Sequence, residues 1–165
     1  MRYLLNQPQK MLKKVKKWLG IEGVKLELVL PEELDLSSGK LIGKIQFYSM
    51  HEQTVSRLKI RLLERYTRGR KKSDKVTDEF QLGDIDISKQ IHIPAGEVVE
   101  VEFKLPFTLV KSEMDSLEDK NFVLGKLVKT AKWISGVQSE YRVEAEADVI
   151  GTPLNPFDKK NIHII

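Results

Sequence analysis

Residues 99–107 read VEVEFKLPF, and this stretch decides the class of fold. Valine, phenylalanine and leucine occupy its odd positions, whereas glutamate and lysine occupy positions 100, 102 and 104. Successive side chains of a strand point to opposite faces of a sheet, so this two-residue period predicts a β-strand with one buried and one wet face. Pro106 lacks a backbone N–H, which predicts that the strand ends at a sheet edge or a bulge.

The same two-residue period recurs on both sides of this strand. It covers residues 24–30, 41–47, 58–66, 76–93, 141–149 and 162–164. Within 76–93 the apolar residues move from even to odd positions, which predicts a bend or bulge near Gly83. Residues 94–97 and the polar stretch 32–39 are typical of turns. Seven or eight strands at short spacing, without regular strand–helix alternation, predict a mostly-β, antiparallel β-sandwich.

Two stretches follow the helical period instead. Residues 8–19 place Met11, Val15 and Trp18 on one face and lysines on the other, which predicts a basic amphipathic helix. A leucine-rich stripe with Ser116 as a candidate cap predicts a late helical insertion at about 116–135. The predicted organisation is an N-terminal helix in residues 1–23 and one sandwich in residues 24–165 that carries the insertion.

The size and composition favour one globular domain. A chain of 165 residues can bury a core without help from a metal or a disulfide. The sequence contains no cysteine, which excludes disulfides, zinc-thiolate sites and a cysteine nucleophile and fits a reducing compartment. No stretch approaches the ~18 apolar residues that a membrane-spanning helix needs. We therefore expect a cytoplasmic protein, with peripheral contact to a membrane as an alternative.

The sequence contains no recognisable catalytic or metal-binding motif. His51, His92 and His163 lack metal-ligand spacing, and Asp84 with Asp86 lacks the further oxygen ligands that calcium needs. The G-x-S-x-G, phosphate-loop and dinucleotide fingerprints do not occur. We therefore predict that the protein is not an enzyme and that it binds no metal and no cofactor.

Several segments resemble the N-terminal lobe of arrestin-like proteins, and among these the bacterial sporulation-control branch most closely. The segments are residues 36–45 (LSSGKLIGKI), 55–64 (VSRLKIRLLE), 93–106 (IPAGEVVEVEFKLP) and 141–165. The resemblance implies an immunoglobulin-like sandwich and a non-catalytic role in protein binding, scaffolding or regulation, in stress or sporulation-type signalling. Members of this group usually carry two lobes, whereas this chain has room for one. The late helix also lengthens a connection that is short in typical arrestins.

Basic and aromatic clusters are the candidate partner-binding sites. The first cluster consists of Arg65, Arg68, Arg70, Lys71 and Lys72 and indicates an acidic protein partner. The second lies on the outer face of the predicted late helix and consists of Phe122, Lys126, Lys129 and Trp133. Solvated or packed surfaces are the alternative interpretation of both clusters. The two basic helices would alternatively bind an anionic membrane, nucleic acid is the third hypothesis, and a homodimer is also open.

Overall fold

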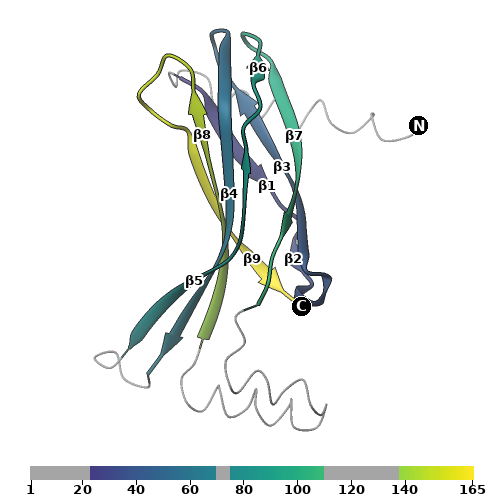
Figure 1. Cartoon of the computed structure of the whole chain (residues 1–165), viewed down its shortest axis with the longest axis vertical. Helices are drawn as coiled ribbons and strands as arrows, with labels where there is room; N and C mark the ends of the chain where they lie inside the picture. The colour runs from purple at the N-terminus through teal and green to yellow at the C-terminus, as the bar shows by residue number, and fades with distance from the viewer. Residues whose placement is uncertain (1–22, 70–74, 110–137) are drawn as a thin grey trace, which may run out of the picture.

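The computed structural model describes residues 23–69, 75–109 and 138–165, and these residues form two β-sheets (Figure 1). The elements are β1 (Lys25–Val29), β2 (Glu33–Leu34), the 3-10 turn η1 (Leu36–Ser38), β3 (Lys40–Tyr48), β4 (Gln53–Arg68), β5 (Val76–Ile87), β6 (Ile91–Ile93), β7 (Val98–Pro106), β8 (Gln138–Val149) and β9 (Phe157–Ile164). The smaller sheet has the order β1-β3-β7. The larger has the order β2-β9-β8-β4-β5, with β6 also paired to β4. The predicted helices at 8–19 and 116–135 lie outside the described residues.

The hydrophobic core lies between the two sheets and is built from the alternate positions that the sequence singles out. Leu26 and Leu28 of β1 are buried, and so are the odd positions of β3 and, in β7, Phe103 and Leu105. The residues that reach zero exposure include Leu28, Leu41, Ile45, Phe47, Val55, Leu58, Ile60, Leu62, Ile93, Leu105, Val143 and Ala147. The predicted mostly-β, two-sheet architecture is therefore confirmed, since the two-residue period assigns the inward face of each strand correctly.

The predicted irregularity near Gly83 is confirmed as a β-bulge. Leu62 of β4 lies opposite Gly83, whereas Leu63 lies opposite Gln81, so Leu82 is the extra residue of β5. A Cβ atom on Gly83 would lie 2.3 Å from the carbonyl oxygen of Pro106. Glycine therefore lets β5 approach the end of β7 closely, and the Thr108 N–H donates to the Leu82 carbonyl at 2.9 Å. This contact joins the two sheets at one end of the sandwich.

Two smaller sequence predictions have different outcomes. Pro106 ends β7, which is an edge strand, as predicted. The polar stretch 32–39, predicted as a turn only, also contains β2, which pairs parallel with β9 through Glu33 and His163. The sandwich is therefore not wholly antiparallel. Two residues are too few to show a period, so the sequence pattern could not reveal this strand.

The edge of β1 is covered by side chains of β9. The Leu28 N–H donates to Asp158 Oδ2 at 2.9 Å, and Lys160 Nζ donates to the Leu28 carbonyl oxygen. Lys160 also pairs with Glu27 at 3.3 Å. Both backbone groups of Leu28 are therefore satisfied by the other sheet, which closes this side of the sandwich against further strand pairing.

Candidate interaction surface

The outer face of the larger sheet is a lattice of opposite charges. Strand β4 lies between β8 and β5, and its outward face carries the basic residues Arg57, Lys59, Arg61 and Arg65. Cross-strand register places acidic residues of β5 and β8 on both sides of the basic ones. The opposed sets are Asp86, Lys59 and Glu146; Asp84, Arg61 and Glu144; and Glu79, Arg65 and Glu140. The face that looks basic in the sequence is therefore charge-balanced in the structure.

Arg57 and Asp86 form the tightest pair of this lattice. Arg57 Nε donates to Oδ1 and Oδ2 of Asp86 at 2.8 and 3.0 Å, and Arg57 Nη2 donates to Oδ2 as well. This hydrogen bonding holds the pKa of the Asp86 carboxyl below its ordinary value, and burial opposes it only in part. Asp86 is therefore a fixed anion at neutral pH and not a proton donor.

Glu144 accepts from two guanidinium groups. Arg61 Nη2 lies 2.9 Å from Glu144 Oε2, and Arg142 Nη2 lies 2.9 Å from Glu144 Oε1. Arg142 also reaches Glu79 of β5 at 3.0 Å and so crosses over β4. One carboxylate of this sheet thus binds cations on two sides at once.

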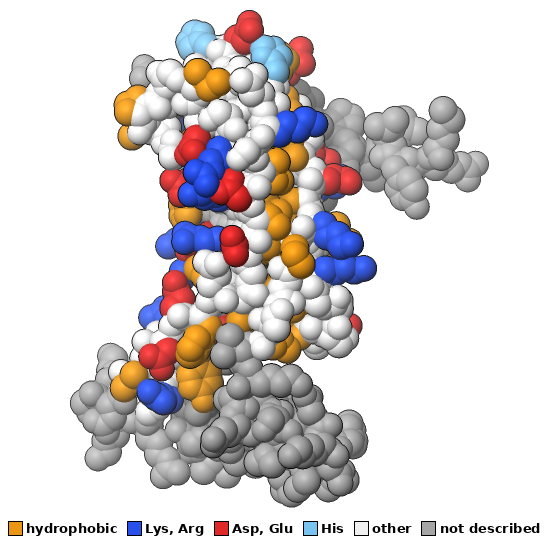
Figure 2. Space-filling model, viewed as in Figure 1, with side chains coloured by type: hydrophobic (Ala, Val, Ile, Leu, Met, Phe, Trp, Pro, Cys, Tyr) orange, Lys and Arg blue, Asp and Glu red, His pale blue; other side chains and the backbone are white. Residues whose placement is uncertain are grey.

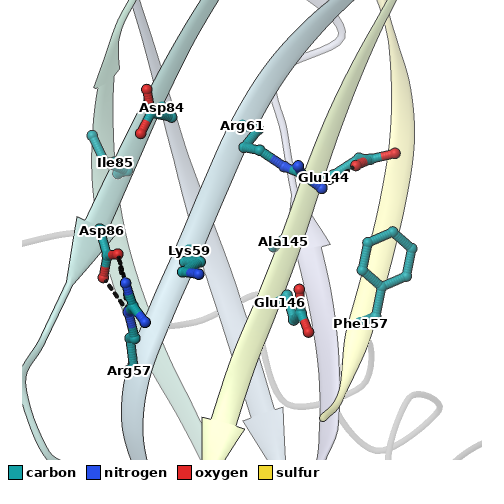
Figure 3. A pocket seen from close by; sticks show the side chains of 10 residues that line it. All are labelled: Arg57, Lys59, Arg61, Asp84, Ile85, Asp86, Glu144, Ala145, Glu146 and Phe157. Carbon is teal, nitrogen blue, oxygen red and sulfur yellow. Dashed lines mark hydrogen bonds and ion pairs between the residues drawn. The ribbon is translucent and has the colours of Figure 1, made fainter. Parts of the chain in front are cut away.

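A shallow hollow of about 300 Å³ lies within this lattice (Figure 3). Its lining consists of Arg57, Lys59, Arg61, Asp84, Ile85, Asp86, Glu144, Ala145, Glu146 and Phe157. The ring of Phe157, on β9, forms an apolar wall, and this residue is 48% exposed. Because most of its charged groups pair with one another, the hollow presents a fixed pattern of charge and one apolar wall.

The residues predicted from sequence to bind partners are only partly described by the structure. Arg65 is exposed on β4 between Glu79 and Glu140, and Arg68 ends that strand 3.5 Å from Asp78. The other predicted residues, Arg70, Lys71, Lys72, Phe122, Lys126, Lys129 and Trp133, lie outside the described residues. The structure therefore places Arg65 and Arg68 on one strand, each beside acidic neighbours.

The side of the sandwich opposite the β1–β9 contact is open. In Figure 2 a band of hydrophobic side chains runs along the molecule between β5 and β6 on one side and β7 on the other. The half-buried apolar residues that pack against the core from these strands are Ile85, Ile87, Ile91, Val99 and Val101. Strand β7 pairs only with β3, and β5 only with β4, among the described strands. Sequence reasoning assigned these residues to the core and could not foresee that one side stays uncovered.

Two other kinds of site are absent from the described residues. In residues 23–69, 75–109 and 138–165, no three histidine, aspartate or glutamate side chains are grouped so that they could hold a metal ion. Over the same ranges, no helix has the length and apolar character needed to cross a membrane.

The fold and the surface define this chain as a two-sheet β-sandwich protein with a charge-balanced outer face and one open side. The chain belongs to the Spo0M family, whose model, described as SpoOM protein, matches residues 12–111. The crystal structure of Spo0M, the sporulation control protein of Bacillus subtilis, superposes with a TM-score of 0.56 at 13% sequence identity, over 87% of this chain and 50% of that one. This chain thus spans half the length of that protein. No curated protein matches the sequence. The predicted relationship to the sporulation-control branch is confirmed.

Proposed function

We propose that this chain is a non-catalytic protein-interaction module of arrestin-like, immunoglobulin-type fold that acts in cytoplasmic regulation of the sporulation or stress type. The observation that carries the proposal is the open side of the sandwich. Membership of a family described by a sporulation control protein supports the regulatory part of the proposal. The basic helices, with membrane binding as their alternative role, and the nucleic-acid hypothesis stay predictions from sequence.

The open side has the two properties that a protein partner needs. It exposes apolar side chains in a continuous band, and contiguous apolar surface of this kind marks interaction sites in folded proteins. It also leaves backbone groups of the β7 edge without a ladder partner among the described strands. An extended segment that adds to such an edge gains main-chain hydrogen bonds and apolar contact together.

The charged hollow supports a non-catalytic role. A general acid or base works best when its pKa lies near the working pH. The pKa of Asp86 is instead pushed down by Arg57, and Glu144 is held between two arginines. These groups stabilise the sheet and fix its surface charge, which is the task of a recognition surface.

Site-specific photo-crosslinking tests the proposed function. A photoreactive amino acid replaces Lys104, whose side chain is exposed on the outward face of β7, and the full chain is expressed in its native cells. We expect a covalent adduct with another protein at this position. The control replaces Lys159, an exposed residue of β9 in the larger sheet, and should give no adduct. Absence of an adduct at position 104, or equal adducts at both positions, would refute the proposal.

A further inference from the structure

We infer that the open side binds an extended protein segment in which basic and apolar side chains alternate, and that this segment adds as a new strand to the edge of β7. The inference rests on the proposed function and specifies the partner. Three features of the described residues support it: the geometry of the β7 edge, the apolar band beside it and the acidic side chains on its outer face.

The β7 edge offers room for one strand. β7 pairs with β3 along its whole length, from Val98 opposite Tyr48 to Pro106 opposite Lys40. On its other side, the Thr108–Leu82 hydrogen bond marks where the two sheets meet. Between the start of β7 and that junction the edge has no ladder partner among the described strands. An edge of this length accommodates a strand of about six residues.

The inward face of an added strand would meet apolar surface. Val99 and Val101 of β7 are half-buried, and Ile85 and Ile87 of β5 are half-buried on the other side of the opening. Figure 2 shows this band from outside, where nothing among the described residues covers it. Alternate side chains of the added strand would cover the band, so every second residue of the partner should be apolar.

The outward face of the added strand would meet carboxylates. Glu100, Glu102 and Lys104 lie on the outward face of β7, so two of its three outward side chains are carboxylates. Lys44 of β3 lies 2.7 Å from Glu100 and 3.5 Å from Glu102, and Gln46 Nε2 donates to the other oxygen of Glu100 at 2.9 Å. A cation from the partner would approach the same carboxylates from the free edge. Glu144 shows that a carboxylate of this fold accommodates two cations at once. An acidic partner would instead face like charges directly opposite, which is destabilising.

The remaining exposed edges fit this partner less well. The β1 edge is occupied at Leu28 by Asp158 and Lys160. The β5 edge carries Asp84 and Asp86 and is therefore also acidic, but it is shorter between the bulge at Leu82 and the end of the strand at Ile87. The two acidic edges face one another across the apolar band, so both repel an acidic segment.

Binding of designed peptides to the full chain tests the inference. The probe is an acetylated, amidated peptide KVKIKV, and its matched control EVEIEV keeps the apolar residues and reverses the charge. Two attractive cross-strand pairs, at Glu100 and Glu102, outweigh one repulsive pair at Lys104 and predict about a threefold preference for the basic peptide. The net charge of the chain is +4, so long-range attraction favours the acidic peptide, and a basic preference must come from the local surface.

Nuclear magnetic resonance titration supplies the second readout. We expect the backbone amides of residues 98–104 to shift on addition of KVKIKV. A third peptide, KVKIKV methylated on alternate backbone nitrogens, keeps the side chains but cannot complete the ladder, and it should lose at least about tenfold in affinity. Glu100→Lys with Glu102→Lys should reverse the charge preference. Glu140→Lys, which makes a like change on β8 of the larger sheet, should not.

The possible results separate this inference from the proposed function. No binding of KVKIKV, equal or tighter binding of EVEIEV, or indifference to backbone methylation would each overturn the inference. If any of these results accompanies a crosslinked adduct at position 104, the interaction module stands and its partner has another chemistry. If the adduct is absent as well, both proposals fail.

Discussion

Replacing Gly43 by alanine tests how closely the central strand β3 and the edge strand β7 of the smaller sheet are packed. Gly43 of β3 lies directly opposite Phe103 of β7. A Cβ atom on Gly43 would lie 2.6 Å from Cζ and 2.9 Å from Cε1 of Phe103, and 3.2 Å from Cδ2 of Leu30. Carbon atoms in favourable contact are about 3.5–4.0 Å apart. The phenylalanine ring would therefore have to move by about 1 Å within the core.

Two opposing terms set the magnitude of this change. Overpacking a core typically costs about 1–3 kcal/mol. Alanine also restricts the unfolded chain, and this stabilises the folded state by about 0.4–1 kcal/mol where the backbone permits it. The steric term is the larger, because the ring is buried and the overlap is with its rigid edge. We expect Gly43→Ala to lower the free energy of unfolding by about 1–2 kcal/mol.

Urea denaturation of four chains measures the effect: the original, Gly43→Ala, Phe103→Leu and the double variant. Phe103→Leu removes the ring and leaves space that the new methyl group partly fills. The double variant should therefore be more stable than the sum of the single losses by about 1 kcal/mol. Gly151→Ala is the control, because this glycine has φ +80° and no atom lies within 4 Å of a Cβ built on it. Its substitution should lower the free energy of unfolding by about 1–2 kcal/mol through backbone strain alone. Phe103→Leu should therefore not reduce this loss.

Two results would refute this reasoning. The first is a Gly43→Ala chain within about 0.5 kcal/mol of the original, which is the range of ordinary surface substitutions. The second is strict additivity of Gly43→Ala and Phe103→Leu, because it would show that the ring and the new methyl group do not compete for the same space.

Three further outcomes follow from the side-chain contacts. Asp158→Ala should speed hydrogen exchange of the Leu28 amide, because it removes the carboxylate that accepts from this amide. Asp158→Asn keeps an acceptor oxygen and should speed the exchange less. Equal exchange rates in the original chain and both variants would contradict the contact between Leu28 and Asp158. Asp86→Asn should lower the free energy of unfolding at neutral pH. The difference from the original chain should vanish as the pH falls through the lowered pKa of Asp86, because the protonated carboxyl no longer attracts Arg57. A difference independent of pH would exclude the ion pair as its cause. Burial, and then Glu64, raise the pKa of the Tyr141 phenol. The free energy of unfolding should therefore fall as the pH rises above about 10, the pKa of a tyrosine in the unfolded chain. Tyr141→Phe should remove this part of the pH dependence.

The strands of this protein could be predicted from sequence because their signal is local. The alternation in 99–107 and 141–149 follows from the backbone geometry of a strand and needs no knowledge of the neighbours. The bulge at Leu82 was visible as a change from even to odd positions. The parallel pair between β2 and β9 was not visible, because it joins Glu33 to His163 across nearly the whole chain.

The candidate surface was predictable only in its composition. The sequence showed that Arg61 and Arg65 share the outward face of a basic strand. It could not show that Arg61 meets Glu144, which is 83 positions away, because cross-strand register depends on which strands become neighbours. The basic outward face of β4 therefore became part of a balanced lattice once β5 and β8 were in place.

By itself the sequence determined which side chain of each strand turns inward, because the two-residue period of a pleated backbone is a property of the chain. Tertiary structure alone decided which charges meet and which edges remain exposed. Side chains of β9 cover the β1 edge at Leu28, whereas the β7 edge beside Val99 and Val101 has no such cover among the described residues. This difference arises from how the two sheets stack, since stacking brings together residues that are remote in sequence.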